Sequence, residues 1–268
     1  MLEPVQKKTV SYFESPLFKK FNANITCGFL TKKGRLSDNT PIELDMSNRP
    51  SIKTSSFLMY ELIADSFGLL HKKPIFMSQP HKSEIAVIKD IPGMSTLSGY
   101  DGAITTSRDI ILNILTADCA PIFIVNKSSA FISALHCGWK SLLAGIISKT
   151  AEKFQQMKIE AGDILVSVGP CIHSCCYEVK EEIRYKFRSI FGPRLDTFFR
   201  EDGSRLFFDL PGAVRESFIQ EKIPPENIEI IDRCTCCSKD LFFSSRRDNS
   251  MSRLLNFISL SSDDQKNL

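Results

Sequence analysis

The stretch TADCAPIFIVNKSSAFISALHCGW, residues 116–139, contains two apolar runs joined by the short polar segment NKSS. The runs PIFIV and AFISAL have the length and composition of buried β-strands, and NKSS is typical of a hairpin turn. A turn centred between Lys127 and Ser128 gives cross-strand partners whose residue numbers add up to about 255. On this register Cys119 lies directly opposite His136, with Cβ atoms about 4.5–5.5 Å apart at the open end of the hairpin.

The segment HCGWKSLLAGIISKTAEKF follows the hairpin, and its apolar residues predict a helix over 140–157 that begins after Gly138. The start of this helix would lie beside Cys119 and His136, where its backbone N–H groups favour a phosphate or a thiolate. A cysteine and a histidine at such a place fit two chemistries, a thiolate–imidazole nucleophile pair and a metal site. A third ligand would favour the metal. The spacing alone leaves that ligand open among the remaining histidines, His71, His81 and His173.

The composition is that of an ordinary globular protein, with 268 residues, 43% hydrophobic and 24% charged residues and a formal net charge of +3. Charges of both signs are spread along the chain, which gives no electrostatic footprint for nucleic acid. No run approaches the roughly 18 apolar residues of a transmembrane helix, and the N-terminus lacks the apolar region of a signal peptide. Nine cysteines without a secretion signal indicate reduced thiols. We therefore expect a soluble, cytoplasmic protein that binds neither nucleic acid nor membranes.

Strands and helices are predicted from the period of the apolar residues. The strands are expected at 24–31, 74–78, 84–89, 110–115, 121–126, 130–136, 163–168, 206–208 and 228–231. The helices are expected at 55–69, 140–157, 178–191, 211–221 and near 252–257. Strands and helices do not alternate strictly, and no linker, repeat or change of composition divides the chain. These features predict a single α/β domain over residues 1–268, a sandwich of mixed β-sheets flanked by helices.

Two further cysteine clusters stand out, CIHSCC with Cys171, Cys175 and Cys176, and CTCC with Cys234, Cys236 and Cys237. Cysteine is among the residue types most often buried. The C-x₃-C and C-x-C spacings differ from the C-x₂-C spacing of zinc knuckles. We therefore expect buried thiols, some of them lining the pocket, with a second, structural zinc site as the alternative.

Several motifs, in order along the chain, carry a resemblance to a known family: QPHKSE, YDGAITT, TADCAPI, HCGWKSLLAGI, GPCIHSCCYEV, FDL, DRCTCC and FFSSRRD. Together they resemble the laccase-domain or YfiH-like family, first labelled multicopper polyphenol oxidoreductases and later assigned as purine nucleoside phosphorylases. The resemblance runs from about residue 24 to about residue 260. It implies a single α/β domain with sheets between helices, phosphorolysis of adenosine, inosine and methylthioadenosine, and adenosine deamination.

The same resemblance implies a zinc (Zn²⁺) site formed by His81 of QPH, Cys119 of ADC and His136 of the H-x-G-W motif. It thus supplies the third ligand that the spacing left open. Copper at this three-ligand site would be a substitute for zinc, because the order of affinities favours copper. The expected partners are a purine nucleoside and phosphate, while the oligomeric state is left open.

Phosphorolysis requires a cationic site for orthophosphate, for which Lys32, Lys140 and Arg246 are the candidates. Lys32 stands in TKKGRLS, where the family usually has arginine, and lysine keeps the charge but loses bidentate geometry. An alternative for Lys140 is a solvated cation in the first turn of the helix. For Arg246 and Arg247 the alternative is a structural ion pair with Asp248 or another carboxylate.

Two other activities stay open at this point. Cys119 as nucleophile and His136 as base would suit a hydrolase acting on a cell-wall precursor amide, a role also associated with bacterial members of the family. A polyphenol oxidase with copper at the same site is the other alternative, suggested by the older family name. Four histidines in total cannot furnish both a type 1 copper centre and a trinuclear cluster, which argues against multicopper oxidation.

Overall fold

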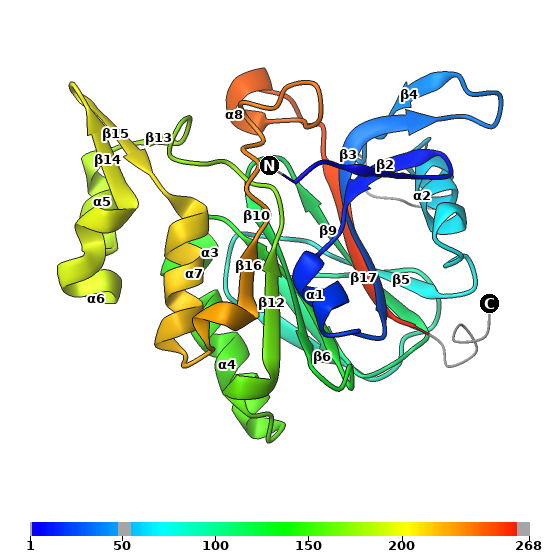
Figure 1. Cartoon of the computed structure of the whole chain (residues 1–268), viewed down its shortest axis with the longest axis horizontal. Helices are drawn as coiled ribbons and strands as arrows, with labels where there is room; N and C mark the ends of the chain where they lie inside the picture. The colour runs from blue at the N-terminus through cyan, green and yellow to red at the C-terminus, as the bar shows by residue number, and fades with distance from the viewer. Residues whose placement is uncertain (1, 48–54, 262–268) are drawn as a thin grey trace.

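A computed structural model of the chain describes residues 2–47 and 55–261. Two large β-sheets pack face to face, and helices cover their outer faces (Figure 1). The predicted sandwich of mixed β-sheets flanked by helices is therefore confirmed. No helix of the described residues is both long enough and apolar enough to cross a membrane.

The first sheet has the strand order β1-β2-β3-β17-β9-β5-β7, and β4 pairs with β3. Its strands β5 and β7 are parallel to their neighbours, and the other pairs are antiparallel. The strands are β1 (Val5–Lys7), β2 (Val10–Phe13), β3 (Ile25–Arg35), β4 (Pro41–Glu43), β5 (Lys73–Met77), β7 (Ser95–Leu97), β9 (Ile110–Thr116) and β17 (Leu254–Leu260).

The second sheet has the order β16-β12-β10-β11-β8-β6, with the β10–β11 hairpin near its centre. Its strands are β6 (Ile85–Ile88), β8 (Gly102–Thr105), β10 (Ala120–Asn126), β11 (Ile132–Cys137), β12 (Ile164–Val168) and β16 (Ile228–Ile230). A small third sheet, ordered β13-β15-β14, consists of β13 (Glu178–Val179), β14 (Phe199–Asp202) and β15 (Arg205–Phe208).

Helices close the outer faces of both large sheets. α2 packs its buried residues against the first sheet, and α3, α4 and α7 pack theirs against the second. The helices are α1 (Pro16–Lys20), α2 (Ser55–Ser66), α3 (Trp139–Leu143), α4 (Ile146–Gln156), α5 (Glu181–Lys186), α6 (Arg188–Phe191), α7 (Leu210–Gln220) and α8 (Ser245–Asp248).

Strand β10 shows why the central strands of the second sheet have continuously apolar sequences. Successive side chains point to opposite faces of a strand, so Ile122 and Ile124 pack on the helix side while Phe123 faces the first sheet. There Phe123 stacks on Phe29 of β3, with ring centroids 4.5 Å apart. A strand covered on both faces needs apolar residues at every position, which is the pattern of PIFIV.

The register of the β10–β11 hairpin corrects one prediction. Pro121, and not Cys119, is the cross-strand partner of His136, so the predicted direct pairing is wrong by two residues. The connection is longer than the predicted turn, because the Asn126 side chain accepts the N–H of Ala130 and holds a wider loop. A shift of two residues leaves every side chain on its predicted face of the sheet.

The predicted helix near 252–257 is wrong. This segment lies in β17, which pairs with β3 on one side and β9 on the other and therefore occupies the middle of the first sheet. Its side chains alternate between two cores, with Leu254 and Ile258 between the sheets and Leu255 and Phe257 under α2. A short apolar run is compatible with the period of a helix and with that of a strand. Here the segment is a strand because it pairs with two strands that are distant in the sequence.

The helix predicted over 140–157 is present but interrupted. α3 ends before Gly145, which has a left-handed backbone with φ of 79°, and α4 begins directly after it. The helix predicted over 178–191 is also divided, into α5 and α6 at Phe187, and its first residues form β13. The helices predicted at 55–69 and 211–221 are confirmed, as are the predicted strands.

Candidate active site

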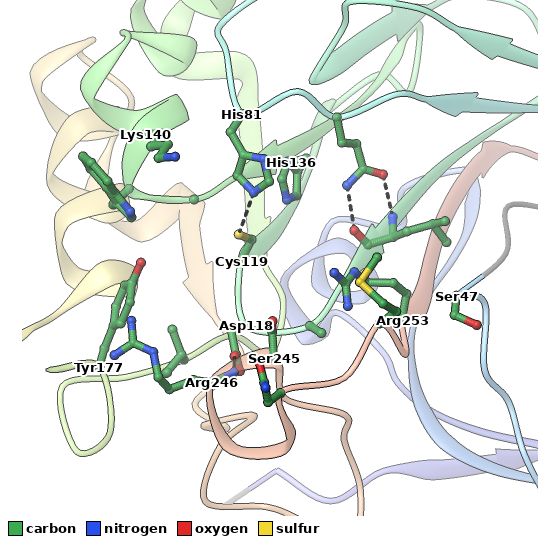
Figure 2. A pocket seen from close by; sticks show the side chains of 18 residues that line it. Ser47, His81, Asp118, Cys119, His136, Lys140, Tyr177, Ser245, Arg246 and Arg253 are labelled. Atoms are coloured by element: carbon green, nitrogen blue, oxygen red, sulfur yellow. Dashed lines mark hydrogen bonds between the residues drawn. The ribbon is translucent and has the colours of Figure 1, made fainter. Parts of the chain in front are cut away.

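A pocket of about 1060 Å³ opens where β10 and β11 meet the turn after β5 and the segment around α8. Figure 2 shows His81, Cys119 and His136 pointing toward one another within it, with Tyr177 and Arg246 on one side and Arg253 on the other. The pocket is lined by Ser47, Gln79, His81, Leu115, Ala117, Asp118, Cys119, His136, Gly138, Trp139, Lys140, Ile172, Tyr177, Ser245, Arg246, Asn249, Met251 and Arg253.

Three potential metal ligands converge in this pocket. One ligand atom each from His81, Cys119 and His136 lies within 4.8 Å of the others. Cys119 Sγ is 3.8 Å from His81 Nε2, and the two imidazole rings meet edge to face with centroids 4.8 Å apart. The juxtaposition of Cys119 and His136 therefore holds although their strand register differs from the prediction.

Asp101, which precedes β8, orients both histidines. Its carboxylate is fully buried and accepts hydrogen bonds from His136 Nδ1 at 2.9 Å, the His81 backbone N–H at 3.0 Å and the Lys82 N–H at 2.6 Å. With the Nδ1 proton of His136 held by Asp101, the lone pair of Nε2 is available for a metal or a proton.

The turn that carries His81 is held in an unusual backbone conformation. His81 and Gln79 both have positive φ, 61° and 55°, which non-glycine residues rarely adopt. The Gln79 side chain accepts the N–H of Leu115 and donates to its carbonyl, so the turn is fastened to the end of β9. Strained backbone of this kind concentrates at functional sites, where surrounding contacts maintain it.

Asp118 lines the pocket, and its carboxylate is used by structural hydrogen bonds. Its backbone has a φ of 96°, and its carboxylate accepts the Thr235 hydroxyl at 2.7 Å and the Arg246 N–H at 2.7 Å. Asp118 thus fastens the residue before Cys119 to the Arg246 segment, which lines the pocket, and to the loop at Thr235.

Gly138 leaves space for the thiol. A Cβ atom at this position would lie 2.8 Å from Cys119 Sγ and 3.5 Å from His81 Cδ2. The first distance is too short for real atoms, so a side chain there would displace the thiol. This close approach accounts for the glycine in HCGW.

The electrostatics of the pocket favour a charged thiolate. Burial alone would raise the pKa of Cys119, but the charge and hydrogen bonds of His136, with those of His81, lower it to about 6. Burial opposes the charged form of His136 as well, yet Cys119 and Asp101 raise its pKa to about 9. Without a metal, Cys119 and His136 therefore form a thiolate–imidazolium pair.

These groups fit a metal such as zinc. A thiolate and two imidazole nitrogens match the three protein ligands usual for catalytic zinc, which keeps a fourth position for water or substrate. The arrangement already stabilises a positive charge beside the thiolate, and a metal would replace the proton as that charge. Asp101 supplies the second-sphere hydrogen bond that zinc-binding histidines usually have.

Two of the three predicted phosphate-binding cations line the pocket, Lys140 and Arg246. The Arg246 guanidinium lies 5.1 Å from the Tyr177 ring, and its Nη1 donates to the Glu178 carbonyl at 2.6 Å. Lys140 Nζ lies 5.7 Å from the Trp139 ring. Both aromatic rings line the same pocket and offer surfaces on which a purine can stack.

The third predicted cation, Lys32, lies elsewhere. Its Nζ is 2.7 Å from the Glu43 carboxylate and 5.6 Å from the Phe243 ring, beside two other hollows. Pairing of β3 with β4 sets this position, because it places Glu43 opposite Lys33 and so within reach of the neighbouring Lys32. Arg253 contributes a cation to the pocket instead, and its Nη1 donates to the Ser252 carbonyl at 2.8 Å.

The other residues considered as candidates have structural surroundings. His173 Nδ1 lies 3.5 Å from the Asp232 carboxylate, and burial lowers its pKa. Arg247 pairs with Asp248, as the alternative interpretation predicted, and donates to backbone carbonyls. Cys137 is buried in the core on the helix side of the second sheet.

Sequence reasoning missed Asp101, Gln79 and Arg253. Asp101 lies in YDGAITT and Gln79 in QPHKSE, so both stood inside motifs already singled out, but nothing local connects them with His136 or Leu115. Arg253 was not recognised as a pocket residue because its segment was predicted as a helix near 252–257.

Comparisons with known proteins place this geometry in context. The profile of a family described as multi-copper polyphenol oxidoreductase laccase matches residues 26–261. The chain is 32% identical over 167 residues to purine nucleoside phosphorylase YlmD of Geobacillus stearothermophilus. This match covers 61% of each protein, so it spans less than two thirds of that relative's length.

A second relative is adenosine deaminase RL5 of an unknown prokaryotic organism, 28% identical over 177 residues, covering 63% of this chain and 68% of the relative. The crystal structure of YlmD from Geobacillus stearothermophilus superposes with a TM-score of 0.82 at 25% identity. That superposition covers 96% of this chain and 98% of the other, which supports the sandwich fold over nearly its full length.

Proposed function

The chain belongs to the multi-copper polyphenol oxidoreductase laccase family, and on this premise we propose that it is a zinc-dependent purine nucleoside phosphorylase. We propose that residues 1–268 act as one catalytic domain on adenosine, inosine and methylthioadenosine, with adenosine deamination as a second activity. The observation that carries the proposal is the convergence of His81, Cys119 and His136 in a pocket also lined by cations and aromatic rings. The names of the relatives, purine nucleoside phosphorylase and adenosine deaminase, support it.

His81, Cys119 and His136 would hold the zinc ion, and Asp101 would keep Nε2 of His136 directed at it. A zinc ion bound there would act as a Lewis acid on a substrate oxygen and would lower the pKa of bound water. Copper at the same ligands would be a substitute.

Phosphorolysis needs orthophosphate beside the anomeric carbon of the nucleoside while the base departs. Arg246 and Arg253 can hold phosphate through paired N–H donors, and Lys140 can add a point charge. The contact with the Glu178 carbonyl fixes the Arg246 guanidinium before phosphate arrives, which reduces the entropy lost on binding. Positioning of the two reactants in this way is the main contribution that such a pocket makes to the rate.

The purine requires a flat surface and exclusion of water. Trp139 and Tyr177 offer ring faces at the wall of the pocket, where stacking of a base contributes about 1–3 kcal/mol. Binding of the base there would place the ribose between the rings and the ligands. The same pocket would then serve phosphorolysis at the ribose and deamination at the base, depending on which reactive atom faces the metal ligands.

The test is to incubate the zinc-loaded protein with adenosine, inosine or methylthioadenosine, with and without phosphate, and to resolve sugar 1-phosphate, free base and ammonia. We expect phosphate-dependent release of base from each nucleoside and ammonia from adenosine. Cys119→Ala and His136→Ala should lose both zinc and turnover. The absence of any phosphate-dependent product would overturn the phosphorylase proposal while leaving the metal site to be judged by metal content.

The phosphate-binding role has its own test. Arg246→Ala should lower kcat/KM for phosphate by roughly 10- to 100-fold, because it removes charge-assisted hydrogen bonds that contribute about 1.5–3 kcal/mol. Arg205→Ala is the matched control, since Arg205 also lies over an aromatic ring, that of Phe207, but outside the pocket. Equal effects of the two substitutions would exclude a specific role for Arg246.

A further inference from the structure

A second group of thiols gathers beside the pocket wall, formed by Cys175, Cys176, Cys234 and Cys237. Their four Sγ atoms all lie within 4.8 Å of one another, and Cys237 Sγ is 3.3 Å from both Cys175 Sγ and Cys176 Sγ. Four thiolates around zinc at about 2.3 Å would have sulfur–sulfur distances of about 3.8 Å. The four thiols therefore need only small movements to surround one ion.

The expectation that these cysteines are buried thiols is wrong for Cys175 and Cys237, whose side chains are exposed. An exposed cysteine gains little from packing, so burial does not account for these two members of the group. The structure also changes how the spacing is interpreted, because Cys234 and Cys237 form a C-x₂-C pair. This is the usual zinc-knuckle spacing, and the sequence concealed it by placing Cys236 between them.

The backbone brings the two loops together without help from the thiols. Thr235 N–H donates to the Cys171 carbonyl at 3.0 Å, where Cys171 and Cys234 form an isolated parallel β-bridge. A turn on each loop then aims its cysteines at the same point. In one loop Cys176 N–H donates to the His173 carbonyl, and in the other a hydrogen bond closes back onto the Cys234 carbonyl.

Two arginine side chains bind the backbone of the loops that carry the group. Arg247 Nη1 donates to the carbonyls of Thr235 and Cys236 at 3.0 and 2.8 Å, and Arg200 Nη2 donates to the Ser174 carbonyl at 3.1 Å. Each guanidinium group is also paired with a carboxylate, Arg247 with Asp248 and Arg200 with Asp202, so these arginines fasten the two loops rather than add free positive charge. Because neighbouring thiolates repel one another, all four thiols can be deprotonated together only around a cation.

We propose that Cys175, Cys176, Cys234 and Cys237 form a second, structural zinc site, separate from the ligands in the pocket. Four protein ligands leave no open coordination position, which is the pattern of structural zinc. The ion would fasten the loop before Tyr177 to the loop that leads toward α8. Because Tyr177 and Arg246 line the pocket, the ion would hold one wall of it in place.

The test is the zinc content of the purified full-length protein, measured by inductively coupled plasma mass spectrometry after removal of loosely bound metal. We expect about two zinc ions per chain in the native protein and about one in Cys175→Ser and Cys237→Ser. Cys236→Ser is the matched control, since it removes a thiol from the same loop without removing one of the four ligands, and it should keep both ions.

The ligands of the second zinc ion can be identified without relying on the number of zinc ions per chain. In His81→Ala, which removes a ligand of the pocket site, X-ray absorption at the zinc edge should show a sulfur shell at about 2.3 Å without imidazole scattering. In the native protein, bound zinc should protect the four cysteines from iodoacetamide, and a strong chelator should expose them. This measurement keeps the test valid if the serine variants do not fold.

Three results would overturn the proposal. These are an equal zinc content in the native protein and in Cys237→Ser, loss of zinc from Cys236→Ser to the same extent as from Cys237→Ser, and a disulfide between Cys237 and a neighbouring cysteine in the native protein purified under reducing conditions. None of these results depends on nucleoside turnover, so they are distinct from failure of the proposed function.

Discussion

Replacement of Asp101 by asparagine tests the geometry of the pocket most directly. The Asp101 carboxylate serves three donors at once, His136 Nδ1, the His81 N–H and the Lys82 N–H. An asparagine has the same shape, but only one acceptor oxygen and an NH₂ group in place of the other. One orientation places the NH₂ group against the Lys82 N–H, 2.6 Å away in the native protein.

The other orientation turns the NH₂ group toward His136 Nδ1, which must then accept a hydrogen bond. The proton of a neutral His136 would move to Nε2 and occupy the lone pair that a metal needs. In either orientation a partly buried backbone N–H, that of Lys82 or of His81, loses its acceptor, which costs at most about 1–3 kcal/mol of folding stability. Loss of a second-sphere partner typically weakens metal binding by 10- to 100-fold, equivalent to about 1.4–2.7 kcal/mol.

The assay is a competition titration of zinc against a chelator, with thermal unfolding of the metal-free proteins in parallel. Asp232→Asn is the matched control, because Asp232 pairs with His173 outside the pocket and its side chain is 85% exposed. We expect that control to bind zinc as the native protein does. A folded Asp101→Asn variant with unchanged zinc affinity would refute the role given to Asp101.

Three further predictions follow from close contacts, core packing and the charge of the thiol. Gly138→Ala should displace Cys119 Sγ and lower the zinc content measured by mass spectrometry, whereas Gly162→Ala, which has open space around it, should not. Phe123→Ala should reduce the free energy of unfolding in urea by about 3–5 kcal/mol, because the ring is fully buried between the sheets. In metal-free protein, iodoacetamide should modify Cys119 increasingly as the pH rises through about 6, where its thiolate forms, and zinc should suppress the reaction. Preferential modification of Cys137, whose pKa burial raises, would contradict this account.

Much of the fold could be predicted because many of its strands are short apolar runs in the sequence. Strands such as β10 and β12 are covered on both faces, so their sequences are continuously apolar and bounded by turn residues. β17 has the same composition, yet its prediction failed, because only pairing with β3 and β9 distinguishes a strand from a helix in a short run. The interruption of the predicted helix 140–157 at Gly145 could not be predicted either, since an isolated glycine is tolerated within a helical pattern.

The residues of the candidate site were likewise predictable only in part. Hairpin reasoning from Cys119 and His136 placed both side chains at one end of the sheet, and a register error of two residues did not disturb this because the period of a strand is two. The third ligand, His81, entered only through resemblance to a family, since its distance to the hairpin depends on how β5 and β6 are placed in different sheets.

The sequence by itself determined strands that are apolar along their length, such as β10 and β12, and the position of a cysteine and a histidine at the end of one hairpin. Tertiary structure alone decided the neighbours of these groups: Asp101 behind both histidines, Arg253 in the pocket in place of Lys32, and Cys237 beside Cys175. The physical reason is that period and composition are local, whereas contacts between segments far apart in the chain depend on strand order and loop course, which no local pattern encodes.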